Sequence, residues 1–253
     1  MTVDEIKEYG NHIASILQFS GQVVGVRLLQ DGIERPEATL SLKQHRYCQA
    51  LMKARRGQSV LLDSAGIACP AAAAAFGFRP LPEGLRNGSG LVGFGIVADA
   101  SVGQRMFQDM PTLPAGQIHS LHVFPLEQTE ALPDVIVIED EVEKLMWVNL
   151  AYLNATGGKR LSSTTAILQA TCVDSTIIPY LEQRLNFGYG CYGCREATDM
   201  GGNESVVGFP AAFLPALVAS LDHLAQKAIP NSRSKRALAA LQRQDDGSKN
   251  LPQ

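Results

Sequence analysis

One short stretch, residues 188–195, most strongly limits how this chain can fold. It reads Gly-Tyr-Gly-Cys-Tyr-Gly-Cys-Arg, and its three glycines and two tyrosines make both a regular helix and a regular strand unfavourable. Glycine lets the backbone turn tightly, so a Cys-x-x-Cys on such a turn directs the sulfurs of Cys191 and Cys194 into one small volume. Metal ions and iron–sulfur clusters need thiolates that converge in this way. The stretch therefore predicts a turn folded around a site.

Composition limits the class of protein. The chain has 253 residues, of which 45% are apolar, enough to bury a sizeable core as one large domain or two interlocked lobes. A net charge of −3 leaves no general basic field, which argues against nucleic-acid and membrane partners. The absence of an apolar signal core and of a long apolar run, together with an odd number of cysteines, five, predicts reduced thiols in the cytoplasm.

The first half of the chain alternates helix and strand signals. Apolar spacing predicts a helix over residues 4–18, and strands are expected at 22–29 and 59–63. Between these strands, Ser41 is the expected N-cap of a helix that runs to Arg56. Pro70 suits a first helical position, so Cys69 is expected directly before a helix, where unpaired N–H groups would stabilise a thiolate.

The second half continues the alternation. Strands are expected at residues 90–98, 118–126, 134–138 and 204–209, and helices at 101–109 and 210–228. Four acids are expected in the first turn of a helix that ends near residue 157, and Pro179 is expected to interrupt a later helix; the acids are Glu139, Asp140, Glu141 and Glu143.

The pattern as a whole predicts an α+β fold. Strands and helices alternate without a sustained βαβ rhythm, which favours a mixed sheet with flanking helices. A single domain is expected over residues 1–230. Residues 231–253 are polar and are expected to be partly disordered, with the last ten as a solvated tail.

The cysteines leave several chemistries open; they are Cys48, Cys69, Cys172, Cys191 and Cys194. A [4Fe–4S] cluster would use Cys69, Cys191, Cys194 and one of Cys48 or Cys172. Four thiolates also suit structural zinc, in a non-redox binding module, and such a module is equally compatible with no metal. Finally, Cys191 and Cys194 are compatible with a thiol oxidoreductase in which Arg195 lowers a thiol pKa.

Three segments resemble a known family. The run Arg46-Tyr47-Cys48-Gln49-Ala50-Leu51 with Ala54-Arg55-Arg56-Gly57, the run Cys69-Pro70 followed by alanines and Phe76-Gly77-Phe78, and the strand 133–138 are similar to signatures of domain-of-unknown-function family 169. The likeness extends over about residues 15–220. Cys48, Cys69 and Cys172 fall on cysteine positions of that pattern, whereas many members carry a Gly-Asp-Arg-like turn where this chain has Cys191 and Cys194.

The resemblance implies the kind of organism in which such proteins occur, and it implies no activity. Members are frequent in anaerobic archaea and bacteria, which suits an oxygen-sensitive cluster, and Arg195 and Glu204 resemble a basic and an acidic residue of the family. We therefore expect an iron–sulfur protein with a role in electron transfer, redox sensing or the binding of a small anionic ligand near Arg195. A redox partner and a homo-oligomer are both compatible with this expectation. The sequence does not distinguish an enzyme from a non-catalytic carrier.

Overall fold

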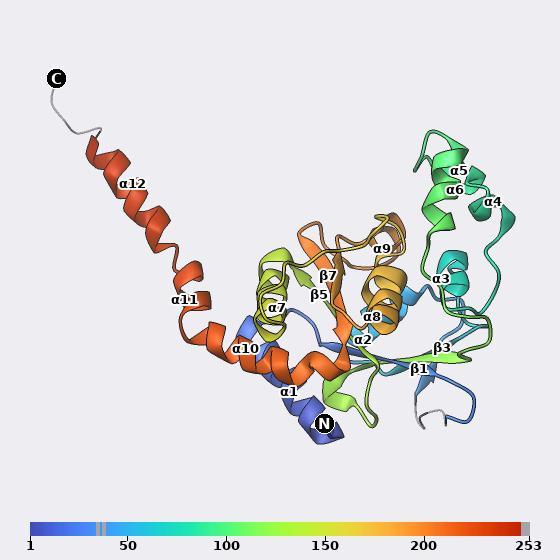
Figure 1. Cartoon of the computed structure of the whole chain (residues 1–253), viewed down its shortest axis with the longest axis horizontal. Helices are drawn as coiled ribbons and strands as arrows, with labels where there is room; N and C mark the ends of the chain where they lie inside the picture. The colour runs from blue at the N-terminus through green and yellow to red at the C-terminus, as the bar shows by residue number, and fades with distance from the viewer. Residues whose placement is uncertain (34–35, 37–38, 249–253) are drawn as a thin grey trace.

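A mixed sheet of seven strands lies at the centre of the fold. The structure is a computed structural model that describes residues 1–33, 36 and 39–248 (Figure 1). The strand order is β2-β3-β4-β1-β5-β7-β6; β2 pairs with β3 in parallel and the other neighbours pair antiparallel. The strands are β1 Val24–Leu29, β2 Leu40–Ser41, β3 Val60–Asp63, β4 Ser120–Pro125, β5 Val135–Glu141, β6 Asn186–Gly188 and β7 Glu204–Pro210. The predicted α+β class, a mixed sheet with flanking helices, is confirmed.

Helices cover both faces of the sheet. Along β5, Val135 and Val137 enter one hydrophobic core and Ile136 and Ile138 enter the other, because neighbouring strand residues point to opposite faces. The first face, which we call the cysteine face, carries α2 Tyr47–Arg55, α3 Pro70–Ala75, the π-helix η2 Ala170–Ile177 and α8 Ile178–Glu182. The second face carries α1 Val3–Leu17, α7 Val142–Ala155 and α10 Leu214–Gln226.

A small helical lobe stands beside the sheet above α3 (Figure 1). It consists of α4 Glu83–Arg86, α5 Ser89–Gly93 and α6 Ala100–Gln108. Leu91 and Phe107 form its core and meet Ala71 and Leu168 of the main body. The lobe therefore has its own small core, which is joined to the cysteine face.

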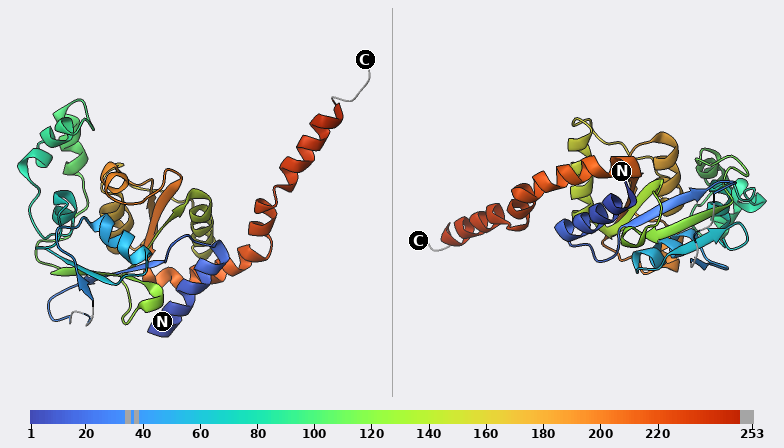
Figure 2. Two further views of the ribbon diagram at one scale, coloured as in Figure 1. Left: turned by 180° about the vertical axis from the view of Figure 1, so that it is seen from behind. Right: turned by 90° about the horizontal axis from the view of Figure 1, so that it is seen from below.

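The remaining helices are short or lead away from the body. They are η1 Leu126–Gln128, α9 Tyr192–Ala197, η3 Ala211–Phe213, α11 Ala228–Arg233 and α12 Arg236–Ser248. Helices α11 and α12 project away from the sheet (Figure 2). The expected solvated tail begins on α12 and continues into residues 249–253, which lie outside the described part. No helix of the described residues is long and apolar enough to cross a lipid bilayer.

The predicted helix start at Ser41 is wrong. Leu40 and Ser41 form β2, which pairs with Val60 and Leu61 of β3, so their backbone groups are used by the sheet. The helix begins at Tyr47 instead, where the side chain of Gln49 accepts a hydrogen bond of 2.9 Å from the N–H of Arg46.

The predicted strand over residues 90–98 is also wrong. Residues 89–93 form α5, and Gly88 before it has φ +81°. A Cβ on Gly88 would lie 1.9 Å from the carbonyl oxygen of Ala100, so only glycine lets α5 and α6 approach this closely. Gly88 thus lets α5 and α6 pack directly against each other, and residues 89–93 form a helix and not a strand.

Two further local expectations are corrected. Glu139, Asp140 and Glu141 belong to β5 and not to the first turn of a helix, because β5 pairs with β7 as far as the Glu141–Glu204 pair. Pro179 does not interrupt a helix; it lies in the first turn of α8, where its missing N–H is tolerated, directly after η2. The expected helix start at Pro70, with Cys69 as N-cap, is confirmed.

Candidate functional site

All five cysteines line one cavity of about 460 Å³, which we call the cysteine cavity. Cys48 is the second residue of α2, Cys69 is the N-cap of α3 and Cys172 lies in η2. Cys191 is the N-cap of α9 and Cys194 is the third residue of that helix. Four segments that lie far apart in the sequence therefore bring their thiols to the same place.

The two thiols of the glycine-rich turn are in direct contact. The Sγ atoms of Cys191 and Cys194 lie 3.0 Å apart, and the N–H of Cys194 donates to the Sγ of Cys191 over 3.4 Å. The hydroxyl of Thr171 in η2 lies 3.6 Å from the Sγ of Cys194. The two thiols converge as predicted, because Gly190 at φ +79° turns the chain into α9. The expectation that this stretch avoids regular helix is wrong for residues 192–195, which begin α9, where the Sγ of the N-cap Cys191 accepts a hydrogen bond from the N–H of Cys194.

The thiols of Cys172, Cys191 and Cys194 have pKa values above the ordinary one of a cysteine and are therefore protonated at pH 7. Burial raises the pKa of Cys172 well above its usual range, and the nearby thiols of Cys69, Cys191 and Cys194 raise it further. A hydrogen bond with Cys194, followed by burial, raises the pKa of Cys191 in the same direction. The hydrogen bond with Cys191 lowers the pKa of Cys194, but Cys48 and burial raise it more, to about 12.

The raised pKa values of Cys191 and Cys194 bear on whether the two thiols act as a catalytic dithiol. A catalytic dithiol attacks as a thiolate and needs a lowered thiol pKa, whereas the pKa values of Cys191 and Cys194 are raised. Arg195 does not reverse this, because its guanidinium donates to the backbone carbonyls of Gly201, Glu204 and Tyr189. The raised pKa values therefore give no support to an activated nucleophile at this turn.

In the part of the chain that the structure describes, no three His, Cys, Asp or Glu side chains surround one point closely enough to hold a metal ion. Tetrahedral zinc with Zn–S bonds of about 2.3 Å requires sulfurs roughly 3.8 Å from one another. The five thiols instead line the wall of a cavity.

Arg46 is the charged side chain among those that line the cysteine cavity. It is the N-cap of α2, and its guanidinium donates to the carbonyl of Gly193 over 3.1 Å and to the carboxylate of Glu196. Arg195, the residue predicted to bind an anion, is not among the lining residues, and its role as a ligand-binding residue stays a prediction. The motif Arg46-Tyr47-Cys48 was the sequence signal that could have pointed to Arg46.

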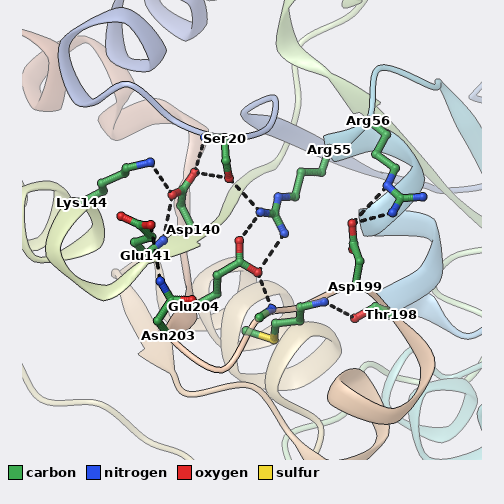
Figure 3. A network of polar contacts seen from close by, with 12 residues as sticks. Ser20, Arg55, Arg56, Asp140, Glu141, Lys144, Thr198, Asp199, Asn203 and Glu204 are labelled. Carbon is green, nitrogen blue, oxygen red and sulfur yellow. Dashed lines mark hydrogen bonds and ion pairs between the residues drawn. The ribbon is translucent and has the colours of Figure 1, made fainter.

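A largely buried ion pair between Arg55 and Glu204, drawn in Figure 3, links α2 to β7. Arg55 of α2 reaches Glu204 of β7 with both terminal nitrogens, one of them over 3.3 Å, and donates to the hydroxyl of Ser20 over 3.0 Å. Glu204 also accepts a hydrogen bond of 2.6 Å from the N–H of Gly201. The pair therefore ties the helix that carries Cys48 to the segment that follows Cys194.

The buried carboxyl of Glu139 is expected to make stability depend on pH. Glu139 follows Val135 and Val137 on the cysteine face of β5, and burial raises its pKa from the ordinary 4.5 to about 7, although Arg55 lowers it. Between these two values the folded chain binds more protons than the unfolded chain, so its free energy of unfolding falls as the pH rises.

Urea unfolding at pH values from 5 to 8 measures this effect. Wild type is expected to lose stability as the pH rises towards about 7 and to change little above that, and Glu139→Gln is expected to flatten the slope below pH 7. A residual slope is expected from Asp174, whose pKa burial also raises to about 7. Equal slopes for wild type and Glu139→Gln would contradict this assignment.

Cys69 is expected to be the first thiol to react in metal-free protein. It is partly exposed, whereas Cys48, Cys172, Cys191 and Cys194 are buried. Iodoacetamide followed by peptide mass spectrometry should find Cys69 modified well before the other four, and all five modified at similar rates in denaturant. Faster modification of Cys191 or Cys194 in the native protein would show that the turn opens readily.

Comparison with known families identifies the group to which the chain belongs. The sequence model of domain-of-unknown-function family 169, described as "Uncharacterised ArCR", matches residues 12–220. The chain is a member of this family. The match confirms the resemblance drawn from the sequence and includes all five cysteines and Arg46. No curated protein and no solved structure matches the chain.

The match to family 169 assigns no activity to the chain, because the family is described as uncharacterised. The chemistry of the cysteine cavity is therefore what indicates the function of this family member.

Proposed function

We propose that this member of family 169 binds one [4Fe–4S] cluster in the cysteine cavity. The ligands are Cys69, Cys191, Cys194 and one of Cys48 or Cys172. The observation that carries the proposal is the meeting of five thiols, from four separate segments, on the wall of one cavity of about 460 Å³. Free cysteines that serve only as small buried hydrophobes have no reason to gather in this way.

A cluster and a single metal ion differ in where they need their thiolates. A [4Fe–4S] cluster presents its irons at separate corners, so its thiolates surround a volume, whereas zinc draws four sulfurs around one point. Cys191 and Cys194 lie 3.0 Å apart, so one of these side chains has to rotate for each thiolate to ligate a different iron. The neighbouring Gly190 and Gly193 have no side chain, which leaves room for such a rotation.

The surroundings also suit an anionic group. Four thiolates give the cluster negative charge, and the first turn of the nine-residue helix α2 presents its positive dipole end and the guanidinium of Arg46 to the same cavity. The N–H of Cys194 already points to the Sγ of Cys191, the kind of hydrogen bond that tunes a cluster potential. Because the thiols of Cys172, Cys191 and Cys194 have raised pKa values and are protonated, their binding to a cluster releases protons, and loading is favoured at higher pH.

The role that follows is electron transfer, redox sensing or chemistry on a small ligand held against the cluster. The deciding experiment is iron, sulfide and zinc analysis of protein isolated without oxygen. About four irons and four sulfides per chain, in a brown protein, are expected. Colourless protein without iron overturns the proposal, and about one zinc per chain supports the non-redox alternative instead.

A second candidate is a reversible Cys191–Cys194 disulfide in protein that has lost its metal. The 3.0 Å contact between the two Sγ atoms favours it. Formation of the S–S bond releases two protons and passes two electrons to an oxidant such as a low-molecular-weight disulfide. Mass spectrometry of metal-free protein treated with oxidised glutathione tests it: an intramolecular bond that Cys194→Ser abolishes supports it, and five free or only mixed-disulfide thiols exclude it.

A further inference from the structure

The cysteine cavity has a second half that contains no sulfur. The thiols occupy one side, and the other side is formed by apolar side chains, namely Leu85, Leu91, Phe94, Ile96, Phe107 and Leu168. None of these groups can ligate iron, so a cluster explains only the sulfur half of the wall. The whole cavity falls within the range of about 300 to 1,000 Å³ that is typical of sites for small organic molecules.

Most of the apolar half comes from the small lobe of α4, α5 and α6 and the loop between α5 and α6, whereas Leu168 belongs to the main body. Leu91 and Phe107 belong to the buried core of this lobe, whereas the ring of Phe94 lines the cavity and is 64% exposed. An accessible apolar wall offers the apolar part of a small molecule a surface against which it is removed from water.

Arg46 supplies the charge that the rest of the wall lacks. Its guanidinium donates to the carbonyl of Gly193 over 3.1 Å and forms an ion pair with Glu196. The side chains of this pair are 37% and 53% exposed, so solvent screens the pair and an incoming anion can compete with Glu196 at little cost. The guanidinium fork matches the geometry of a carboxylate.

We propose that the cysteine cavity binds a small organic monoanion, a carboxylate with an apolar body. The apolar body lies against Leu91, Phe94 and Phe107, and the carboxylate pairs with Arg46. That the ligand also lies against an iron–sulfur cluster rests on the proposed function. The binding site itself depends only on the cavity wall, so the two ideas fail separately.

The probe for this site is octanoate, with acetate and octanol as references for the charge alone and the apolar body alone. Calorimetric titration of the full-length protein, once as isolated without oxygen and once freed of iron, should show octanoate binding more tightly than either reference. Arg46→Gln is expected to weaken octanoate at least about tenfold and to leave octanol unchanged, while Arg46→Lys restores part of the loss. Phe94→Ala is expected to weaken octanoate and octanol together.

Matched controls are available on the same elements. Arg56→Gln changes an exposed arginine at the other end of α2, and Val92→Ala trims an exposed side chain of α5, and neither residue lines the cavity. Both controls should bind octanoate as wild type does, and thermal melting confirms that each variant is folded.

The outcomes separate the site from the cluster. Octanoate binding that Arg46→Gln and Phe94→Ala weaken supports the site even when the iron analysis is negative, in which case the proposed function alone fails. Protein that holds iron but binds octanoate no better than octanol overturns the site and leaves the cluster standing. Equal weakening by Arg46→Gln and Arg56→Gln also overturns it, because the effect would then come from net charge.

Discussion

Serine in place of Cys191 or Cys194 is expected to reduce the iron content from about four per chain to less than about one. A serine hydroxyl is a poor iron ligand at neutral pH. Both positions belong to the glycine-rich stretch that lines the cavity. Cys69→Ser should have a similar effect on iron while keeping the start of α3, since serine is itself a good N-cap. Iron and sulfide analysis after isolation without oxygen is the measurement.

Cys48 and Cys172 provide the internal control for this series. Both are buried and both line the cavity, yet a cluster with four cysteine ligands needs only one of them. One of Cys48→Ser and Cys172→Ser should therefore lose the iron while the other keeps it. Retention of about four irons in all five single variants would show that the cysteines do not hold the cluster.

Arg55→Met is expected to lower the free energy of unfolding by about 3 to 5 kcal/mol, because it leaves the Glu204 carboxylate buried without its partner. The side chains of this pair are only 10% and 11% exposed, so water cannot replace the lost contact. A loss of that size is a large fraction of the stability of an ordinary domain. Urea unfolding of the metal-free protein measures it.

The neighbouring arginine is the matched control for that prediction. Arg56 pairs with Asp199, but these side chains are 59% and 40% exposed, so Arg56→Met should cost less than about 1 kcal/mol (Figure 3). The joint change Arg55→Met with Glu204→Leu should cost less than Arg55→Met alone, since it leaves no carboxylate behind. Equal losses from Arg55→Met and Arg56→Met would mean that the buried pair does not hold the turn.

Local sequence patterns predicted the elements on which the site is built. Pro70 after Cys69 marked the start of α3, and the glycines before Cys191 marked a tight turn, but they did not mark the helix α9 that begins at Tyr192. These features follow from backbone preferences of a few adjacent residues. The predictions failed where a distant partner competed, as at Ser41, whose backbone pairs with Leu61 of β3.

The sequence by itself determined which chemistry the chain carries: five thiols, two of them on a glycine-rich turn, and a helix start beside a third. Only the tertiary structure decided that α2, the Cys69 N-cap, η2 and the start of α9 meet in one cavity, and that Arg46 rather than Arg195 faces it. The physical reason is that distances between segments depend on which sheet face each helix covers. That choice is made by packing across the whole core, which no short stretch of sequence encodes.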